Sequence, residues 1–491
     1  MNKVNTATFD VAIVGNGVLG LSTAFALSSK DSSLKIALIG PSQRTGAASV
    51  AAGAMLGCFG EITKATFHSK QSRLKFDLAL RALRMWPDWI DKINAANNEE
   101  QPVSETRGTF IILNSKSGRI ESENFATLLD TLDSIGETYE DVDASEIKGL
   151  SPSQDYRPLR SIYLPNEGCM ESGRWLNALQ RALAAKPQVH FIDAPLESLH
   201  VDPESRRPLL MLPSGERIVS PKVVLAAGVY TQTLIDQIPE LRNAIPRIFS
   251  GVGTSLTLSQ NAANPIHQVI RTPNRAGACG LHVLPTQTDT LYIGASNDVA
   301  ISPESQTTAG IMHFLLECAI EQINTDLYRS TLLGSRTGNR PVPADSFPLV
   351  GPTSVEGLWI LTGTYRDGFH QSPLWATEIA SVLLGGDFSF DNLFVPERAP
   401  IKTYTREKAI QIYLDHHMAG FYEHGFKLPK IASESAFEMM LREKIERVYD
   451  GIGSDFGISP DILLMFELES APLRSQAILK REYGCDKLAV C

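Results

Sequence analysis

The chain has 491 residues, of which 43% are hydrophobic and 20% are charged. This composition is that of a soluble globular protein, and the length predicts roughly two to four domains. The net charge of −10 at pH 7 argues against a nucleic-acid-binding protein, because a polyanion would be repelled. The six cysteines are scattered and form no C-x-x-C pair. They predict neither a disulfide scaffold nor a zinc module, and they favour the reducing cytoplasm.

The first forty residues predict a strand, a glycine turn, a helix and a second strand. Apolar runs occupy residues 9–14 and 34–39, and a helical pattern covers residues 19–29 between them. This unit predicts two parallel strands joined by a right-handed crossover. No charged residue occurs from Val11 to Ser29, a length that approaches a membrane span. Three glycines interrupt that stretch, so we expect no span and a cytoplasmic protein.

The later elements indicate how the chain is divided. A helical pattern runs through residues 74–93, and we expect Pro87 to break it. Strand patterns follow at residues 109–113, 223–228, 254–258, 291–294 and 358–361, and a last helical pattern covers residues 375–384. The β-α units at the beginning, middle and end predict one nucleotide-binding domain that is interrupted by a β-rich domain.

The residues beyond Pro400 predict a helical extension. One apolar helical face is formed by Ile410, Tyr413, Leu414, His417 and Phe421, and a second by Phe437, Met440, Leu441, Ile445 and Val448. We expect these faces to pack against the rest of the protein or against a neighbouring subunit or partner. The histidines of this segment lack the spacing of metal ligands, so we expect no metal.

Residues 15–20 read Gly-Asn-Gly-Val-Leu-Gly, a G-x-G-x-x-G motif between the first strand and the first helix. The first glycine allows a tight turn, the second lets a pyrophosphate approach the backbone, and the third lets helix and strand pack closely. The helix N-terminus supplies free N–H groups to the anion. The acidic residue expected at the end of the second strand is missing, since Gly40, Pro41 and Ser42 follow Ile39. Ser42, Gln43 or backbone groups would then bind the ribose.

Five segments together resemble the FAD-dependent D-amino-acid oxidase superfamily, and within it the glycine oxidase and sarcosine oxidase branch. They are the glycine motif, the small-residue segment 46–56 (GAASVAAGAML), the stretch 223–231 (VVLAAGVYT), the segment 338–352 (GNRPVPADSFPLVGP) and the turn 363–370 (GTYRDGFH). The segments occur in the order of that superfamily and span residues 9 to about 390. The extension beyond residue 400 is not covered.

The resemblance implies an α/β fold in which an FAD-binding Rossmann-like domain is interrupted by a mixed β-sheet substrate domain. We expect residues 1–100, 150–240 and 335–398 in the FAD-binding domain, residues 101–149 and 241–334 in the substrate domain, and residues 399–491 in the helical extension. The expected FAD-binding residues are Gly15, Gly17, Val18, Leu19, Gly20, Ser42, Ser49, Ala52, Gly53, Met55, Ala227, Gly228, Gly338, Arg366, Asp367, Gly368 and Phe369. No cysteine lies in 335–345, where some relatives attach flavin, so we expect non-covalent FAD.

The resemblance also implies roles for four site residues. Arg340 would bind a substrate carboxylate, for which a guanidinium has matching bidentate geometry. Arg366 would place positive charge beside the flavin and stabilise its reduced, anionic form; the alternative is an ion pair with Asp367. His282 and Tyr365 are expected to line the substrate pocket. Thr364 stands where the family has histidine, and Asp367 where it has asparagine, which leaves the substrate class open.

The function implied is oxidation of the C–N bond of an amino acid or N-substituted glycine-like amine, by hydride transfer to flavin and hydrolysis of the imine. The electron acceptor would be O2 or a protein or quinone, because the sequence has no second glycine motif for a nicotinamide. Two alternatives stay open. One is a flavin monooxygenase or nicotinamide-linked reductase on the same fold. The other is a flavoprotein subunit of a larger assembly that binds partners, or a second copy, through the extension.

Overall fold

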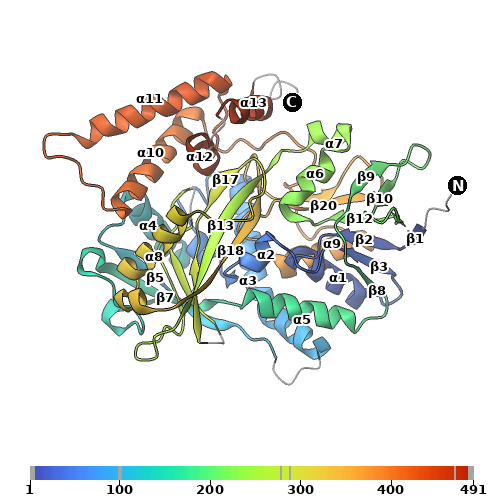
Figure 1. Cartoon of the computed structure of the whole chain (residues 1–491), viewed down its shortest axis with the longest axis horizontal. Helices are drawn as coiled ribbons and strands as arrows, with labels where there is room; N and C mark the ends of the chain where they lie inside the picture. Colours follow the sequence, from blue (N-terminus) through green and yellow to red (C-terminus); the bar gives the residue numbers. More distant parts are fainter. Residues whose placement is uncertain (1–5, 98–101, 277–278, 287–288, 469–471, 485–491) are drawn as a thin grey trace.

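The computed structural model describes residues 6–97, 102–276, 279–286, 289–468 and 472–484. A six-stranded sheet in the order β19-β20-β12-β2-β3-β8 forms the nucleotide-binding side (Figure 1). Neighbouring strands from β20 to β8 are parallel, and β19 is antiparallel to β20. The strands are β2 (Val11–Val14), β3 (Ile36–Ile39), β8 (Val189–Ile192), β12 (Val223–Leu225), β19 (Leu349–Pro352) and β20 (Leu358–Thr362). The expected β-α units at the beginning, middle and end of the chain are therefore confirmed.

Helices cover one face of this sheet and a smaller sheet lies against the other. The helices share an apolar core with β2, β3 and β12; they are α1 (Val18–Lys30), α3 (Lys70–Asn97), α5 (Ser172–Ala184) and α9 (Ser372–Leu383). The opposite face packs against α6 (Thr231–Ile235), α7 (Pro239–Ala244) and a four-stranded sheet. That sheet has the order β1-β11-β10-β9, with β1 (Thr6–Thr8), β9 (Ser198–Val201), β10 (Pro208–Met211) and β11 (Arg217–Val219).

A ten-stranded sheet forms the other half of the molecule. Its order is β17-β13-β16-β15-β14-β5-β7-β4, with β18 beside β13 and β6 beside β7. Its strands are β4 (Met55–Leu56), β5 (Thr106–Asn114), β6 (Glu140–Asp141), β7 (Pro158–Cys169), β13 (Ile248–Ser259), β14 (Val269–Arg271), β15 (His282–Pro285), β16 (Thr290–Gly294), β17 (Asp298–Ala300) and β18 (Leu332–Pro343). Helices α4 (Arg119–Ile135) and α8 (Ala309–Gln322) pack against it.

All three expected pieces of the FAD-binding domain contribute a strand to the ten-stranded sheet, the first of them through β4. Strand β7 lies in the ten-stranded sheet, although residues 150–240 are expected in the FAD-binding domain. Strand β18 pairs with β13 along its length, although residues 335–398 are expected there too. Strand β7 joins the large sheet by pairing with β5, and β18 joins it by pairing with β13. The local sequence carries no signal for the partner of a strand, so these pairings could not be predicted. The division into domains stays a prediction, with β7 and β18 better grouped with the large sheet.

Pro87 does not break its helix, contrary to the sequence expectation. Helix α3 runs without interruption from Lys70 to Asn97 and contains Pro87. Proline removes one backbone hydrogen bond, but the buried face of α3 carries large side chains on both sides of it. Trp86 and Trp89 are 1% and 5% exposed, and the Trp86 indole donates a 2.8 Å hydrogen bond to the His370 carbonyl oxygen. Tertiary packing therefore overrides the local preference.

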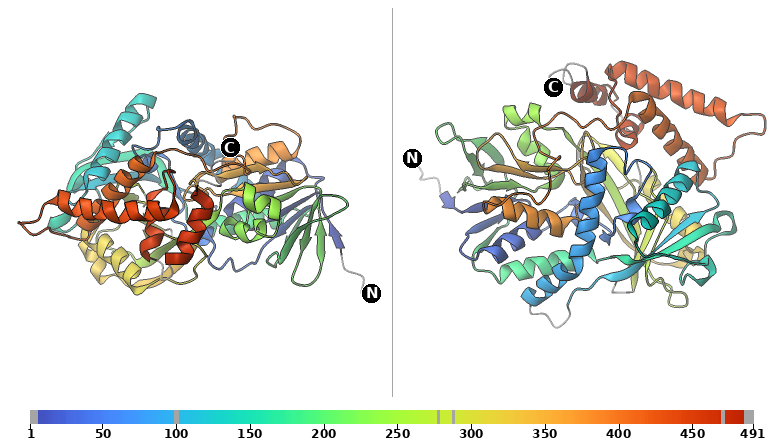
Figure 2. Two further views of the ribbon diagram at one scale, coloured as in Figure 1. Left: turned by 90° about the horizontal axis from the view of Figure 1, so that it is seen from above. Right: turned by 180° about the vertical axis from the view of Figure 1, so that it is seen from behind.

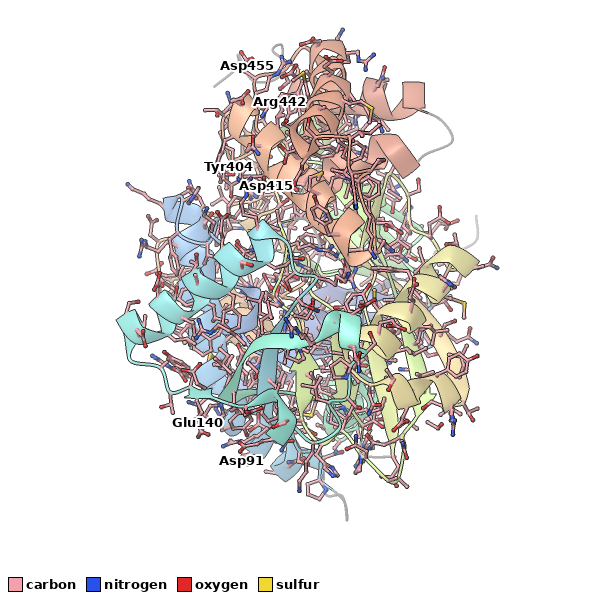
Figure 3. The ribbon with its side chains drawn as sticks, turned by 90° about the vertical axis from the view of Figure 1, so that its left-hand side faces the viewer. Asp91, Glu140, Tyr404, Asp415, Arg442 and Asp455 are labelled. Carbon is pink, nitrogen blue, oxygen red and sulfur yellow. The ribbon has the colours of Figure 1, made fainter. Side chains whose placement is uncertain are left out.

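The described part of the C-terminal extension, residues 399–468 and 472–484, packs on the ten-stranded sheet, so the expectation that the extension contacts the body of the protein is confirmed. It contains α10 (Arg406–Glu423), α11 (Glu434–Ile452), α12 (Pro460–Leu468) and α13 (Pro472–Tyr483). These helices lie above β13 and β17 (Figures 1 and 2). Figure 3 shows Tyr404, Asp415, Arg442 and Asp455 on the extension, at the opposite end of the molecule from Asp91 and Glu140.

The extension and the body share one apolar core. Body residues Phe249, Val299, Val342 and Tyr365 belong to the same buried cluster as side chains from α10, α11, α12 and α13. A buried ion pair adds to it, with 2.8 Å between Nη1 of Arg275 and Oε2 of Glu423. Met440 was expected on the buried face of α11, but it is 55% exposed. Among the described residues, no helix is both long and apolar enough to cross a bilayer.

Candidate cofactor and substrate site

The glycine turn between β2 and α1 has the geometry that the motif predicts. Gly15 has a φ of +120°, and a Cβ there would lie 2.2 Å from the Ala226 carbonyl oxygen. A Cβ on Gly20 would lie 1.8 Å from the Gly15 carbonyl oxygen, so this glycine permits helix and strand to pack closely. Gly17 is the residue before the first turn of α1. N–H groups in the first turn of a helix lack helical partners and can bind an anion, although the Val18 N–H donates to the Ser49 hydroxyl here.

A cavity of about 560 Å³ extends from this turn and fits a dinucleotide. It takes its walls from distant parts of the chain, which include residues 14–52, 195–234 and 338–369. Of the expected FAD-binding residues, those that line it are Gly15, Gly17, Val18, Leu19, Ser49, Ala52, Ala227, Gly228, Gly338, Arg366, Gly368 and Phe369. The Ser49 hydroxyl also accepts a 3.0 Å hydrogen bond from the Val18 N–H, which joins the glycine turn to the segment 46–56. These residues would hold FAD.

Five expected FAD-binding residues do not line this cavity: Gly20, Ser42, Gly53, Met55 and Asp367. The Ser42 N–H donates instead to Asp193 at 2.7 Å, and Asp367 pairs with Lys75 at 3.0 Å. A Cβ on Gly53 would lie 2.6 Å from the Leu284 side chain, so Gly53 is constrained by packing. Met55 lies on β4, near Arg271. Direct contact of these five residues with FAD is a prediction that the cavity does not support.

Asn16 and Arg44 line the cavity where the ribose acid is missing. The Asn16 amide donates 3.0 Å hydrogen bonds to the carbonyl oxygens of Gly40 and Pro41. The Arg44 Nε donates to the Asn16 carbonyl oxygen at 2.8 Å. An amide thus ties the glycine turn to the end of β3. The only sequence signal for this contact with the end of β3 is that the motif contains a polar residue, Asn16, after its first glycine.

Arg340 lines this cavity from β18. Its Nη1 donates 3.0 Å hydrogen bonds to the Ser296 carbonyl oxygen and to Oδ1 of Asn297. Its Nε and Nη2 make no hydrogen bond with the described residues, although each of them is a donor. These two nitrogens form one edge of the guanidinium, which has the geometry to bind a carboxylate.

Tyr365 is joined to Arg340 through Asn297. The Asn297 amide donates to the Tyr365 hydroxyl, and the hydroxyl donates to Oδ2 of Asp461 at 2.5 Å. Tyr365 has a φ of +51°, a left-handed conformation that non-glycine residues rarely adopt. Its side chain is 7% exposed. The sequence analysis missed Asp461, because it lies in the extension that no motif covers.

Arg366 contacts both the cavity and a buried carboxylate. Its guanidinium lies 5.1 Å from the centroid of the Tyr365 ring, and its Nη1 donates to the Cys279 sulfur at 3.4 Å. Nε lies 3.9 Å from Oε2 of Glu61. The alternative ion pair between Arg366 and Asp367 is not the one formed, because Asp367 pairs with Lys75. Arg366 therefore lines the cavity and pairs with Glu61 rather than with Asp367.

His282 is buried on β15 and does not line the 560 Å³ cavity. Its Nδ1 lies 3.0 Å from the Gly280 carbonyl oxygen, which can only accept, so Nδ1 carries the proton. Burial, followed by the charge of Arg271, lowers the pKa of His282 to about 4. The imidazole is therefore neutral at pH 7. Its catalytic role stays a prediction.

A polar cluster that the sequence analysis did not identify lies beside Arg366. Arg271 pairs with Glu61, and Asn274 hydrogen-bonds to both of them at 2.6 Å. Burial favours the neutral form of Glu61, but Arg271, Arg366 and these hydrogen bonds outweigh it and lower the pKa to about 2. Glu167 accepts from the Phe59 N–H at 2.6 Å, yet burial raises its pKa to about 7. The two carboxyl groups therefore titrate in different pH ranges.

A second cavity, of about 310 Å³, lies between the body and the extension. It shares Tyr365 and Arg366 with the first cavity. From the body it is lined by residues that include Glu61, His68 and Lys75, and from the extension by residues that include Tyr404, Lys408, Phe456 and Asp461. Tyr365 and Arg366 therefore border a second cavity in addition to the one along the glycine turn.

Comparison with known proteins identifies relatives of this arrangement. The glycine oxidase of Geobacillus kaustophilus is 23% identical over 394 residues, which cover 79% of this chain and 96% of that protein. Its crystal structure matches with a TM-score of 0.67 at 20% identity, covering 80% of this chain and 99% of that chain. The iminodiacetate oxidase of Chelativorans sp. BNC1 matches with a TM-score of 0.65 at 17% identity, covering 79% and 98%.

The family defined as FAD dependent oxidoreductase matches residues 10–382, well over half of the chain. That range contains the glycine turn, the small-residue segment, Arg340 and the turn with Tyr365 and Arg366. It ends before the C-terminal extension. The fold, the cavity along the glycine turn and this match agree, and the chain belongs to the family: it is an FAD-dependent oxidoreductase.

Proposed function

We propose that this protein oxidises the C–N bond of an amino acid or of an N-substituted glycine-like amine. When bound, FAD supplies the acceptor for the hydride that leaves the α-carbon, and the imine product is hydrolysed by water. The observation that carries the proposal is the free edge of Arg340 at the wall of the cofactor cavity, beside Tyr365. A guanidinium held on one nitrogen by Ser296 and Asn297 is fixed in position and still has two donors for a carboxylate.

The other residues of the site have distinct roles in this proposal. Arg366 keeps positive charge at the cavity wall and stabilises negative charge on the reduced cofactor. No carboxylate lines the cofactor cavity as a strong base, within the described residues. We infer that the substrate amine binds in its neutral form, whose lone pair assists the departure of hydride, so that no strong base is needed at the α-carbon.

The second cavity supports a substrate larger than glycine. Its volume of about 310 Å³ is at the lower end of the range for small-molecule sites, and Tyr365 and Arg366 border it. We assign this space to the side chain or N-substituent of the amine. The related glycine oxidase and iminodiacetate oxidase are both named for small amines that carry a carboxylate, which is consistent with a carboxylate on the substrate.

Anaerobic mixing of the purified holoprotein with a panel of amino acids and N-substituted glycines tests the proposal. We expect loss of the flavin absorption near 450 nm with at least one compound, and no loss with the matching amine that lacks a carboxylate. Bleaching by NADH or NADPH without any amine would instead favour the monooxygenase or reductase alternative. Admission of O2, compared with an artificial quinone, then identifies the class of electron acceptor. A flavin that no compound reduces would favour the assembly-subunit alternative.

A further inference from the structure

The C-terminal extension places a carboxylate against the substrate end of the site. Asp461 is the second residue of α12 and is 3% exposed. It lies 79 residues beyond the end of the family match at residue 382 (461 − 382 = 79). Its Oδ2 accepts the hydrogen bond from the Tyr365 hydroxyl, and its Oδ1 accepts one from the Ser459 hydroxyl. Asp461 therefore reaches a residue that lines both cavities.

Hydrogen bonds run from Arg340 to Asp461 as a chain in which each residue donates to the next. Arg340 donates to Asn297, and Asn297 donates to Tyr365. The Tyr365 hydroxyl then donates to Asp461, which as a carboxylate only accepts. The Tyr365 hydroxyl donates its single proton in the hydrogen bond to Asp461, and one of its two lone pairs accepts from Asn297. The hydroxyl oxygen has one lone pair left. It can accept one more hydrogen bond and can donate none.

An amine and a carboxylate of one substrate need partners of opposite character. Arg340 offers only donors, which suit the carboxylate. The Tyr365 oxygen, held as an acceptor, suits an N–H group of the amine. Asn297 joins the two residues, so their separation is fixed by one side chain that contacts both of them.

We propose that Asp461 is a positioning residue of the active site, which holds the Tyr365 hydroxyl as an acceptor for the amine N–H of the substrate. The inference rests on the proposed function, since it assigns a recognition role within that same site. It makes the extension part of the substrate site rather than a separate module. It also selects for primary and secondary amines, because a tertiary amine has no N–H in its neutral form.

Ligand binding without turnover tests this inference. The probes are 2-aminobenzoate, which has a carboxylate and an amine but no α C–H, and benzoate, which lacks the amine. Affinities are measured from the perturbation of the flavin absorption of the holoprotein. We expect Asp461→Leu, which is similar in size but has no acceptor for the Tyr365 hydroxyl, to weaken 2-aminobenzoate binding about three- to tenfold, the effect of one hydrogen bond, and to change benzoate binding less than twofold. Asp455→Leu, the same change at an exposed residue of the extension, is the matched control.

A double-mutant cycle separates positioning from a general structural effect. If Asp461 acts through Tyr365, Asp461→Leu has no further effect on 2-aminobenzoate in a Tyr365→Phe background. Equal losses for both probes, or effects that add, would overturn the inference. If Asp461→Leu does not fold, Asp461→Ala is measured in its place and must distinguish the two probes. If the variants show the expected difference between the probes but wild-type protein oxidises no amine, the proposed function alone is contradicted. If wild-type protein oxidises an amine but both probes respond equally to the Asp461 variant, the inference alone is contradicted.

Discussion

Arg271 and Glu61 form a buried ion pair, with 3.0 Å between Nη1 and Oε1, between the ten-stranded sheet and the short helix that follows β4 (η1, Phe59–Glu61). The Arg271 side chain is 4% exposed and that of Glu61 is 22% exposed. Glu167 lies near the same guanidinium, whose charge partly offsets the effect of its burial. One arginine thus faces two carboxyl groups, of which only Glu61 is paired with it.

The stability of the protein should depend on pH through Glu167. Its pKa in the folded state, about 7, lies above the ordinary value of 4.5. The contribution of the protonated Glu167 side chain to the free energy of unfolding is therefore fully present below pH 4.5 and is lost as the pH rises through 7. Glu167→Gln keeps an oxygen that accepts from the Phe59 N–H but cannot ionise. We expect it to reduce the fall in the free energy of unfolding between pH 5 and 8, measured by urea denaturation. Glu140→Gln, at an exposed position, is the control.

Glu61 should act in the opposite direction at lower pH. Its folded-state pKa of about 2 lies below the ordinary value of 4.5. Its contribution to stability is present above pH 4.5 and is lost as the pH falls towards 2. We expect Glu61→Gln to lower the unfolding free energy at pH 7 and to remove part of the acid lability. An unchanged acid midpoint in thermal melts would contradict the assigned ion pair.

Arg340→Lys should weaken substrate capture while flavin content stays normal. Lysine retains the charge but loses the paired donors of the guanidinium edge. The cost of about 1.5–3 kcal/mol for charge-assisted hydrogen bonds corresponds to a roughly tenfold to hundredfold rise in KM. Steady-state kinetics with the amine identified by flavin bleaching measure it. Arg329→Lys, at an exposed position, should leave KM unchanged. Unchanged kinetics in Arg340→Lys would show that another residue holds the carboxylate.

The flavin should be released when the protein is denatured. Of the cysteines in the described part of the chain, none lines the 560 Å³ cavity, although Cys279 contacts Arg366. We expect acid precipitation to leave all of the flavin in the supernatant, with the absorption spectrum of free FAD. Flavin that stays with the precipitate would contradict non-covalent binding.

Removal of the extension after Pro400 should destabilise the protein strongly. The truncation exposes Phe249, Val299 and Val342, and each large apolar side chain that loses its cover costs about 1.5–3 kcal/mol. We expect aggregation, or a large fall in Tm with FAD present. The full-length protein, measured with FAD in the same buffer, is the reference. Equal Tm for the long truncation would show that the shared core contributes little.

The sequence predicted what is local and missed what depends on distant pairing. The glycine turn carries a local motif at residues 15–20, although the atoms that crowd Gly15 belong to Ala226 and Ala227, just after β12. The residues from Arg340 to Arg366 were found because a family motif covers them. Asp461 carried no such signal, because its partner Tyr365 lies 96 positions earlier and only the packing of α12 brings them together. The pairing of Arg271 with Glu61, 210 positions apart, was hidden for the same reason.

The three-part cofactor cavity has a consequence for biosynthesis. Its walls include Gly15, Ala227 and Phe369, so it cannot close until three quarters of the chain has left the ribosome. At about 5–20 residues per second, that interval lasts roughly 20 to 70 s after Gly15 is made. During this time β2 and β3 have been synthesised, but their sheet is incomplete until β12 and then β20 follow. A complete cavity for FAD therefore exists only late in translation or after it, and the extension that carries Asp461 is the last part of the site to be made.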